Sequence, residues 1–143
     1  MEARAHDTAI TFTVPGDIVP WARTGGGRNA PRFKPKRQRN FTAVLKDFGQ
    51  KAMGNRSLLD GPCELTIYAR YPWPKSWSRK RRAASGGWKT STPDTDNIAK
   101  MVKDALNGVV YTDDARICAD HYFKFYTDQA PGLTVTIKPL VPA

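Results

Sequence analysis

Two aspartates, a lysine and an Asp-Asp pair stand at a spacing that suits metal-assisted hydrolysis. Asp94 and Asp96 are separated by one residue, Lys100 lies four residues beyond Asp96, and Asp113-Asp114 follows further on. Clustered carboxylates repel one another until a dication relieves the strain. Mg²⁺ or Mn²⁺ takes such hard oxygen ligands and can bind phosphate as well. A metal ion polarises phosphate, and a lysine ammonium stabilises the negative transition state, so the residues indicate phosphodiester hydrolysis.

The local sequence puts the first two carboxylates at the start of a helix. Pro93 favours extended backbone at Thr92, and a helix is predicted from Asp96 to Asn107. Residues two apart point the same way on extended backbone but about 200° apart on a helix. We therefore expect helical geometry to begin at or after Asp94, so that the two carboxylates can converge on one cation.

Ordinary structural roles explain the same residues. Asp94 could cap the helix, Lys100 could be a solvated surface lysine, and Asp113-Asp114 is common turn chemistry. Because a single Asp-x-Asp is frequent, the residues alone leave both a metal site and a structural interpretation open.

Three consecutive segments form a longer pattern. They read Pro93-Asp94-Thr95-Asp96-Asn97-Ile98-Ala99-Lys100, then Asp104-Ala105-Leu106-Asn107-Gly108, then Tyr111-Thr112-Asp113-Asp114. This pattern resembles the signature of the RusA family of Holliday junction resolvases: D-x-D-N-x-x-K, a D-A-L helix end and a D-D turn before a strand. Weaker similarity occurs at Val14-Pro15-Gly16, over 72–82 and in the basic stretch after the first strand.

The resemblance implies an activity and roles for individual residues. Asp94, Asp96, Asp114 and Lys100 would be catalytic, and the three aspartates would bind Mg²⁺, with Mn²⁺ as a substitute and Asp113 as an auxiliary ligand. The resemblance also implies a homodimeric endodeoxyribonuclease that cuts paired strands of a four-way DNA junction in recombination, repair or replication, in the cytoplasm of a bacterial or phage-infected cell. A two-fold dimer suits a junction of two-fold symmetry.

The charge distribution predicts a polyanionic partner. The net charge is +10, and residues 1–92 hold 18 basic and 6 acidic side chains against 5 and 7 in 93–143. A basic surface beside a carboxylate site suits DNA, although a charge that merely keeps the protein soluble is the alternative. The residues predicted to contact DNA are Arg32, Lys34, Lys36, Arg37, Lys75, Arg79, Lys80, Arg81, Arg82 and Lys103.

Several aromatic residues lie near these charges. Phe33, Trp73, Trp77 and Trp88 could stack on bases exposed at a junction centre, or could simply pack against the fold. Trp21 is equally undecided.

The whole chain, 1–143, is predicted to form one α+β domain, RusA-like by the resemblance. Strands are expected at 10–14, 63–71, 116–126 and 133–138, helices at 39–53 and 96–107, and a short helix or basic loop at 76–82. This order predicts a mixed or antiparallel sheet with helices mainly on one face, the last two strands pairing as a hairpin. Residues 1–9 are expected to form a flexible tail and residues 22–36 a mobile basic, glycine-rich arm.

Other classes of protein are excluded or disfavoured. No apolar stretch approaches the ~18 residues of a membrane span, and the N-terminus lacks the apolar run of a secretory signal. Cys63 and Cys118 form neither a disulfide framework nor a zinc pattern, so we expect a soluble intracellular protein. The competing functions are a non-catalytic DNA-binding protein and a nuclease for flaps or other branched DNA.

Overall fold

The computed structural model describes residues 9–19 and 36–141. Its elements, in chain order, are β1 (Ile10–Pro15), α1 (Lys36–Met53), β2 (Cys63–Pro72), α2 (Arg79–Ser85), α3 (Thr95–Leu106), a 3₁₀ helix η2 (Asp114–Arg116), β3 (Ile117–Thr127) and β4 (Gly132–Pro139). Nearly all of the predicted tail and arm, including Arg32, Phe33 and Lys34, lies outside the described residues, and so does Trp21.

The four strands form one mixed sheet in the order β1-β4-β2-β3. β4 pairs antiparallel with both β1 and β2, whereas β3 pairs parallel with β2. The predicted α+β fold is therefore confirmed, but the predicted hairpin of the last two strands is wrong. The residues 128–131 cross over the end of β2, which stops at Pro72, and so β3 and β4 lie on opposite sides of β2.

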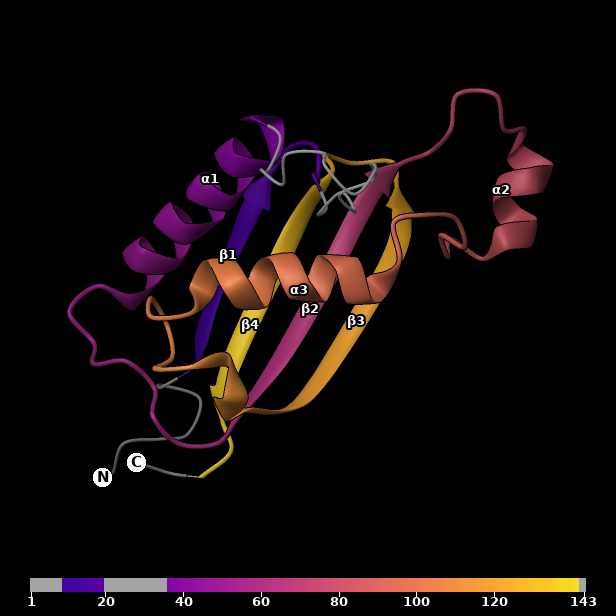
Figure 1. The fold of residues 1–143 in the computed structure, drawn as a ribbon. Helices are drawn as coiled ribbons and strands as arrows, with labels where there is room; N and C mark the ends of the chain where they lie inside the picture. The colour runs from indigo at the N-terminus through magenta and orange to yellow at the C-terminus, as the bar shows by residue number, and fades with distance from the viewer. Residues whose placement is uncertain (1–8, 20–35, 142–143) are drawn as a thin grey trace, which may run out of the picture.

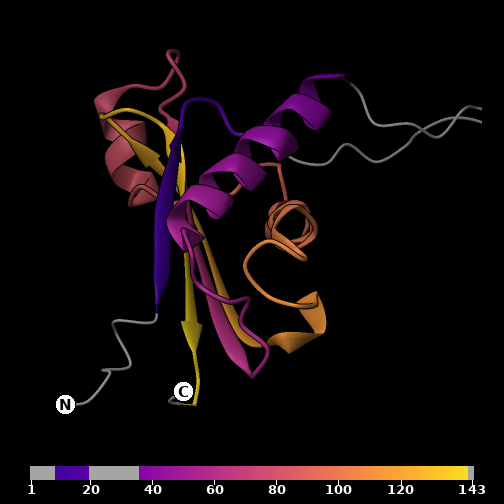
Figure 2. The ribbon, with the colours of Figure 1, turned by 90° about the vertical axis from the view of Figure 1, so that its left-hand side faces the viewer.

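α1 and α3 cover one face of this sheet, as Figure 2 shows. Alternate residues of the strands face these helices: Ile10, Phe12 and Val14 of β1 are buried, as are Leu65, Ile67 and Ala69 of β2. The predicted stripe of α3 packs against them through Ile98, Met101, Val102, Ala105 and Leu106. Burial of this apolar surface is the main stabilising contribution to the fold.

The helix boundaries follow local signals in the sequence. α1 ends before Gly54 and α3 ends just before Gly108, and both glycines adopt positive φ angles, 56° and 76°. Left-handed backbone of this kind commonly terminates a helix. α2 settles the open choice at 76–82 in favour of a helix, because the Ser78 side chain accepts a hydrogen bond from the Arg81 backbone N–H. Within the described residues, no helix combines the length and apolar character needed to cross a membrane.

A glycine allows β1 and β4 to approach closely. A Cβ atom at Gly132 would lie 2.8 Å from the Val14 carbonyl oxygen and 3.3 Å from an Arg70 nitrogen. We expect Gly132→Ala to lower the free energy of unfolding by about 1–3 kcal/mol, because the backbone of β1 must shift. Gly61→Ala is the matched control, since a Cβ there meets no atom within 4 Å. Urea denaturation measures both changes, and equal stabilities would show that the contact is relieved at no cost.

Candidate active site

The first two predicted ligands lie at the start of α3. Asp94 is the N-cap residue with extended backbone, and its side chain makes no capping hydrogen bond. Asp96 lies in the first turn of the helix, where the helix dipole favours negative charge. Asp94, Asp96 and Lys100 are exposed, and none of these side chains forms an ion pair with another described residue. Two carboxylates and an ammonium are therefore available here to a ligand.

A lysine on β3 holds the segment that leads into this helix. Lys124 Nζ donates hydrogen bonds to the carbonyl oxygens of Ser91 and Pro93, each at 2.8 Å. The backbone of Lys89 also donates to the Lys124 carbonyl oxygen, at 3.1 Å. Lys124 was not among the site residues predicted from the sequence. The available signal was a charged residue at a strand position that alternation turns toward the helices.

Lys124 can be tested as an anchor for the candidate site. Hydrogen bonds from a charged group contribute about 1.5–3 kcal/mol each at most, so we expect Lys124→Met to lower the unfolding free energy by about 1–3 kcal/mol. Lys138→Met is the control, because Lys138 is an exposed lysine on β4. Thermal unfolding measures both. Equal melting temperatures for the two variants would show that Lys124 does not anchor the segment.

The acidic turn lies beside the other end of α3. The Tyr111 hydroxyl donates to the carbonyl oxygen of Lys103 at 2.7 Å. Burial raises the pKa of Tyr111, and the nearby charge of Asp114 adds to that increase. Asp114 is thus close to the last turns of the helix. Asp113 accepts a hydrogen bond from the Ala115 backbone N–H at 3.1 Å, so one of its carboxylate oxygens caps η2.

The two acidic groups are far apart within one chain. Lys124, which holds Pro93, lies seven residues along β3 from Ile117, which follows η2; seven residues of strand span about 20 Å. Figure 1 shows the same separation, with η2 (orange, residues 114–116) at the lower end of β3 and the start of α3 much nearer the upper end. The described residues contain no group of three or more His, Cys, Asp or Glu side chains able to hold a metal ion.

Within the described residues of one chain, the acidic turn therefore does not meet Asp94 and Asp96. Asp94 immediately precedes α3 and Asp96 lies in its first turn, whereas the acidic turn follows the opposite end of the helix. A helix of 12 residues is about 18 Å long, so the length of α3 keeps Asp114 away from Asp94. The roles assigned to Asp94, Asp96, Asp113, Asp114 and Lys100 remain predictions.

Lys103, which is predicted to contact DNA, forms an ion pair within the protein. Lys103 Nζ lies 2.8 Å from an oxygen of Asp120, and the two side chains are 27% and 34% exposed. This hydrogen bond is the main cause of a lowered pKa for Asp120. The charge of Lys103 is thus largely compensated.

Three other residues predicted to contact DNA are exposed: Lys36 and Arg37 lie at the start of α1, and Lys75 precedes α2.

Residues 73–88, here called the α2 arm, project beyond the edge of the sheet at β3 (Figure 1). Trp73 stacks on Tyr126 with ring centroids 4.8 Å apart, and Trp77 meets the same ring edge-on at 5.3 Å. These two tryptophans therefore pack against the fold and fix the arm to β3. Trp88 differs from them, because it is 56% exposed.

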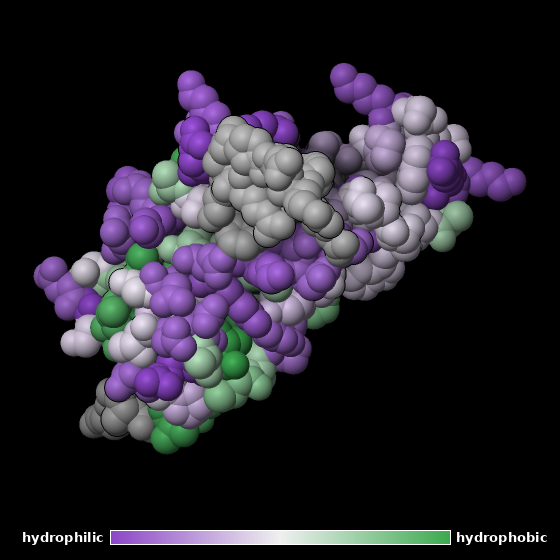
Figure 3. All heavy atoms as spheres, viewed as in Figure 1, coloured by the Kyte–Doolittle hydropathy of each residue, from purple (hydrophilic) through white to green (hydrophobic). Residues whose placement is uncertain are grey.

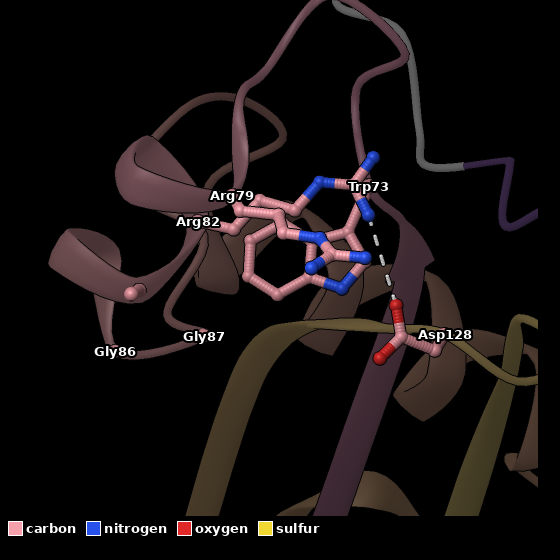
Figure 4. Close-up of a pocket in the computed structure, with 7 residues that line it drawn as sticks. Trp73, Arg79, Arg82, Gly86, Gly87 and Asp128 are labelled. Atoms are coloured by element: carbon pink, nitrogen blue, oxygen red, sulfur yellow. Dashed lines mark ion pairs between the residues drawn. The ribbon is translucent and has the colours of Figure 1, made fainter.

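Arginines are held on the tryptophans of this arm. The Arg81 guanidinium lies 4.2 Å from the ring centre of Trp77, and that of Arg82 lies 5.2 Å from the ring centre of Trp73. Arg82 also makes a long ion pair of 3.7 Å with the exposed Asp128. Figure 4 shows Trp73, Arg82 and Asp128 around an open pocket of about 600 Å³, which is also lined by Arg79. The arm thus presents oriented cations to solvent.

The surface on the helix-covered side is largely polar. Figure 3 shows hydrophilic side chains over α1 and along α3, the helix that begins with the exposed carboxylates. A polyanion can approach this side without displacing a large apolar surface.

The chain is similar to known proteins over most of its length. The family model of endodeoxyribonuclease RusA matches residues 15–138. The chain is also 31% identical, over 140 residues, to the uncharacterized protein YqaN of Bacillus subtilis (strain 168), an alignment that covers 90% of this chain and 95% of YqaN. The family match includes every described residue of the candidate site.

Proposed function

Because the chain belongs to the RusA family of endodeoxyribonucleases, we propose that it resolves four-way DNA junctions by paired, Mg²⁺-dependent strand cleavage in the cytoplasm of a bacterial or phage-infected cell. The observation that carries this proposal is the pair of exposed aspartates at the start of α3, which form no ion pair with another described residue, with Lys100 one turn beyond Asp96 along the helix. α2, the helix that carries the arginines of the arm, lies on the same side of the molecule as the start of α3, as Figure 1 shows.

The chemistry of the site suits a hard divalent ion. Asp94 and Asp96 supply carboxylate oxygens, which Mg²⁺ prefers, and Mg²⁺ is often held by one or two carboxylates together with substrate phosphates. A bound dication would polarise the scissile phosphate and lower the pKa of a coordinated water. Lys100 would then neutralise charge that develops on the phosphate oxygens.

One chain supplies only part of the proposed ligand set, since Asp114 lies beyond the far end of α3. We propose that a second copy provides the missing carboxylate in a two-fold dimer. Such symmetry creates two equal sites, each built from Asp94 and Asp96 of one copy and Asp114 of the other. It also matches the two strands that must be cut in a four-way junction.

Three synthetic substrates test the proposed activity. Wild-type protein is incubated with a four-way junction, a flap and a linear duplex, each with and without Mg²⁺. We expect cleavage of the junction at least tenfold faster than that of the other two, and only with the metal. Faster cleavage of the flap would indicate a nuclease for other branched DNA. A junction that is bound but stays uncut with Mg²⁺ would indicate a non-catalytic binding protein.

The arm can be tested through the salt dependence of binding. Arg79 and Lys80 are exposed residues at the start of α2. If each neutralises one phosphate, the double variant Arg79→Gln, Lys80→Gln should reduce the slope of log K against log[salt] by about 1.8. Binding titrations at four salt concentrations measure this slope. Lys138→Gln, far from the arm on β4, should leave it unchanged, and an unchanged slope in the double variant would mean that α2 faces away from DNA.

A further inference from the structure

The face of the sheet opposite α1 and α3 has a distinct composition. The strand register aligns Thr11, Thr136 and Thr66 in one row across β1, β4 and β2. The next row places Thr13 and Thr134 beside an aromatic pair, Tyr68 of β2 and Phe123 of β3. This face is thus polar over β1 and β4 and carries an aromatic pair where β2 and β3 meet.

Four rings form a continuous aromatic patch, which we define as Tyr68, Phe123, Phe125 and Trp88. Tyr68 stacks on Phe123 at 5.0 Å and meets Phe125 edge-on at 6.3 Å. Trp88 meets Phe125 edge-on at 6.5 Å, and its backbone forms a bridge with that residue. Tyr68 is 39% and Trp88 56% exposed. Large rings that are this accessible are available to a ligand.

Cations stand next to the aromatic patch. A cleft of about 350 Å³ is lined by Trp88, Phe125 and Tyr126 together with Gly86 and Gly87. The same two glycines line the pocket that holds Arg79 and Arg82. Arg70 lies directly beside Phe125 in the register. A ligand that stacks on the rings can therefore place negative groups on these arginines.

We propose that the aromatic patch binds unpaired bases of a DNA strand, with the phosphates on Arg79 and Arg82. Aromatic rings beside cations are the usual platform for single-stranded nucleic acid, because every base has a face that can stack. Exposed aromatic residues on neighbouring strands of a four-stranded sheet serve RNA in the same way. A second copy of the chain fits this face less well, because threonines, Glu64, His121 and Lys138 occupy the rest of it, whereas stable dimer interfaces have apolar centres.

The path of the chain links this patch to the candidate active site. β3 is an edge strand of the sheet, and residues 88–93 pass around this edge. The Lys89 backbone N–H donates a hydrogen bond to the Lys124 carbonyl oxygen, and Lys124 Nζ donates one to the Pro93 carbonyl oxygen. Asp94 follows directly. A strand that leaves the patch around the same edge would reach the carboxylates at the start of α3. The inference rests on the proposed function, since a branch point exposes unpaired bases close to the phosphate to be cut.

Binding measurements with matched variants test the inference. Trp88→Ala and Tyr68→Ala are compared with Leu58→Ala, because Leu58 is as exposed as Tyr68, at 39%, but lies in the α1–β2 connection. Fluorescence anisotropy with a single-stranded 12-mer and with a blunt duplex gives the two affinities. Loss of one base stack should weaken single-strand binding roughly 5- to 100-fold and leave duplex binding within about twofold. Trp88→Phe should restore most of the loss, and the Leu58 variant should match the wild type.

Two outcomes would overturn the inference. One is unchanged single-strand affinity in both patch variants. The other is conversion of a dimer to monomers by Trp88→Ala or Tyr68→Ala, seen by analytical ultracentrifugation, with single-strand affinity per subunit unchanged; the face would then be an interface between copies. All binding is measured in an Asp96→Asn background without cleavage, so a failure of the nuclease proposal leaves this result readable. Photo-crosslinking of 5-iodouracil DNA to Trp88 gives a direct second measurement.

Discussion

Replacement of Asp96 by asparagine should abolish strand cleavage and leave junction binding intact or tighter. The amide has the same shape but no charge, so it cannot hold a dication that needs anionic oxygen ligands. Loss of one group that stabilises developing charge typically costs on the order of 10²–10³ in rate, and loss of the metal as well should push the effect to the upper end. Binding should not suffer, because one negative charge that repels the phosphates is removed.

The measurement is a single-turnover cleavage rate on a four-way junction with Mg²⁺, paired with a binding titration without it. Asp104→Asn is the matched control, because Asp104 is an exposed aspartate on the same helix, two turns further along. It should cleave within about threefold of wild type. Cleavage by Asp96→Asn at the control rate would remove the proposed mechanism, whatever the junction affinity of the variant.

Local sequence signals account for the helices and strands of this fold. Gly54 and Gly108 stand where their helices stop, with the positive φ angles that such a stop favours, and the stripe from Ile98 to Leu106 is buried as its spacing predicts. These features depend on neighbours within a few residues. Strand pairing does not, and so the short connection between β3 and β4 suggested a hairpin although β2 lies between them.

The candidate site shows the same limit. The spacing of Asp94, Asp96 and Lys100 fixes their relation over the N-cap and the first two turns of the helix, and the structure places them at its start. The position of Asp114 depends instead on which way α3 crosses the sheet, which no local pattern records. The role of Lys124 also could not be predicted from the sequence, because its hydrogen-bond partners are distant backbone carbonyls rather than side chains.

The tryptophans illustrate what composition alone leaves open. Four aromatic residues near basic segments suggested base stacking or core packing, without a means to decide for each. The structure separates the described ones: Trp73 and Trp77 pack on Tyr126, whereas Trp88 is exposed on the other side of the same strand, against Phe125. A one-residue step along β3 reverses the face, and this step decides which ring is available.

Mixing two inactive variants should restore activity if the site is shared between copies. Asp96→Asn and Asp114→Asn homodimers each lack one ligand in both sites. In a mixed dimer built as proposed, one site carries both substitutions and the other carries none. An equal mixture should then hold up to about a quarter of the wild-type sites, from the statistics of a two-fold dimer. Because each mixed dimer has one intact site, it should nick a supercoiled cruciform plasmid to the open circle without linearising it.

The control mixture is Asp94→Asn with Asp96→Asn. Both changes fall in the half of the site supplied by one copy, so neither site of the mixed dimer is intact and nicking should stay absent. If the three carboxylates instead came from one chain, every site in the Asp96→Asn and Asp114→Asn mixture would lack a ligand, and no activity would return. An Asp114→Asn homodimer that cuts at the wild-type rate would remove Asp114 from the site and leave the two carboxylates of α3 to hold the metal alone. The seven residues of β3 that separate Ile117 from Lys124 span about 20 Å, and this separation favours the shared site. The recovery of nicking decides it.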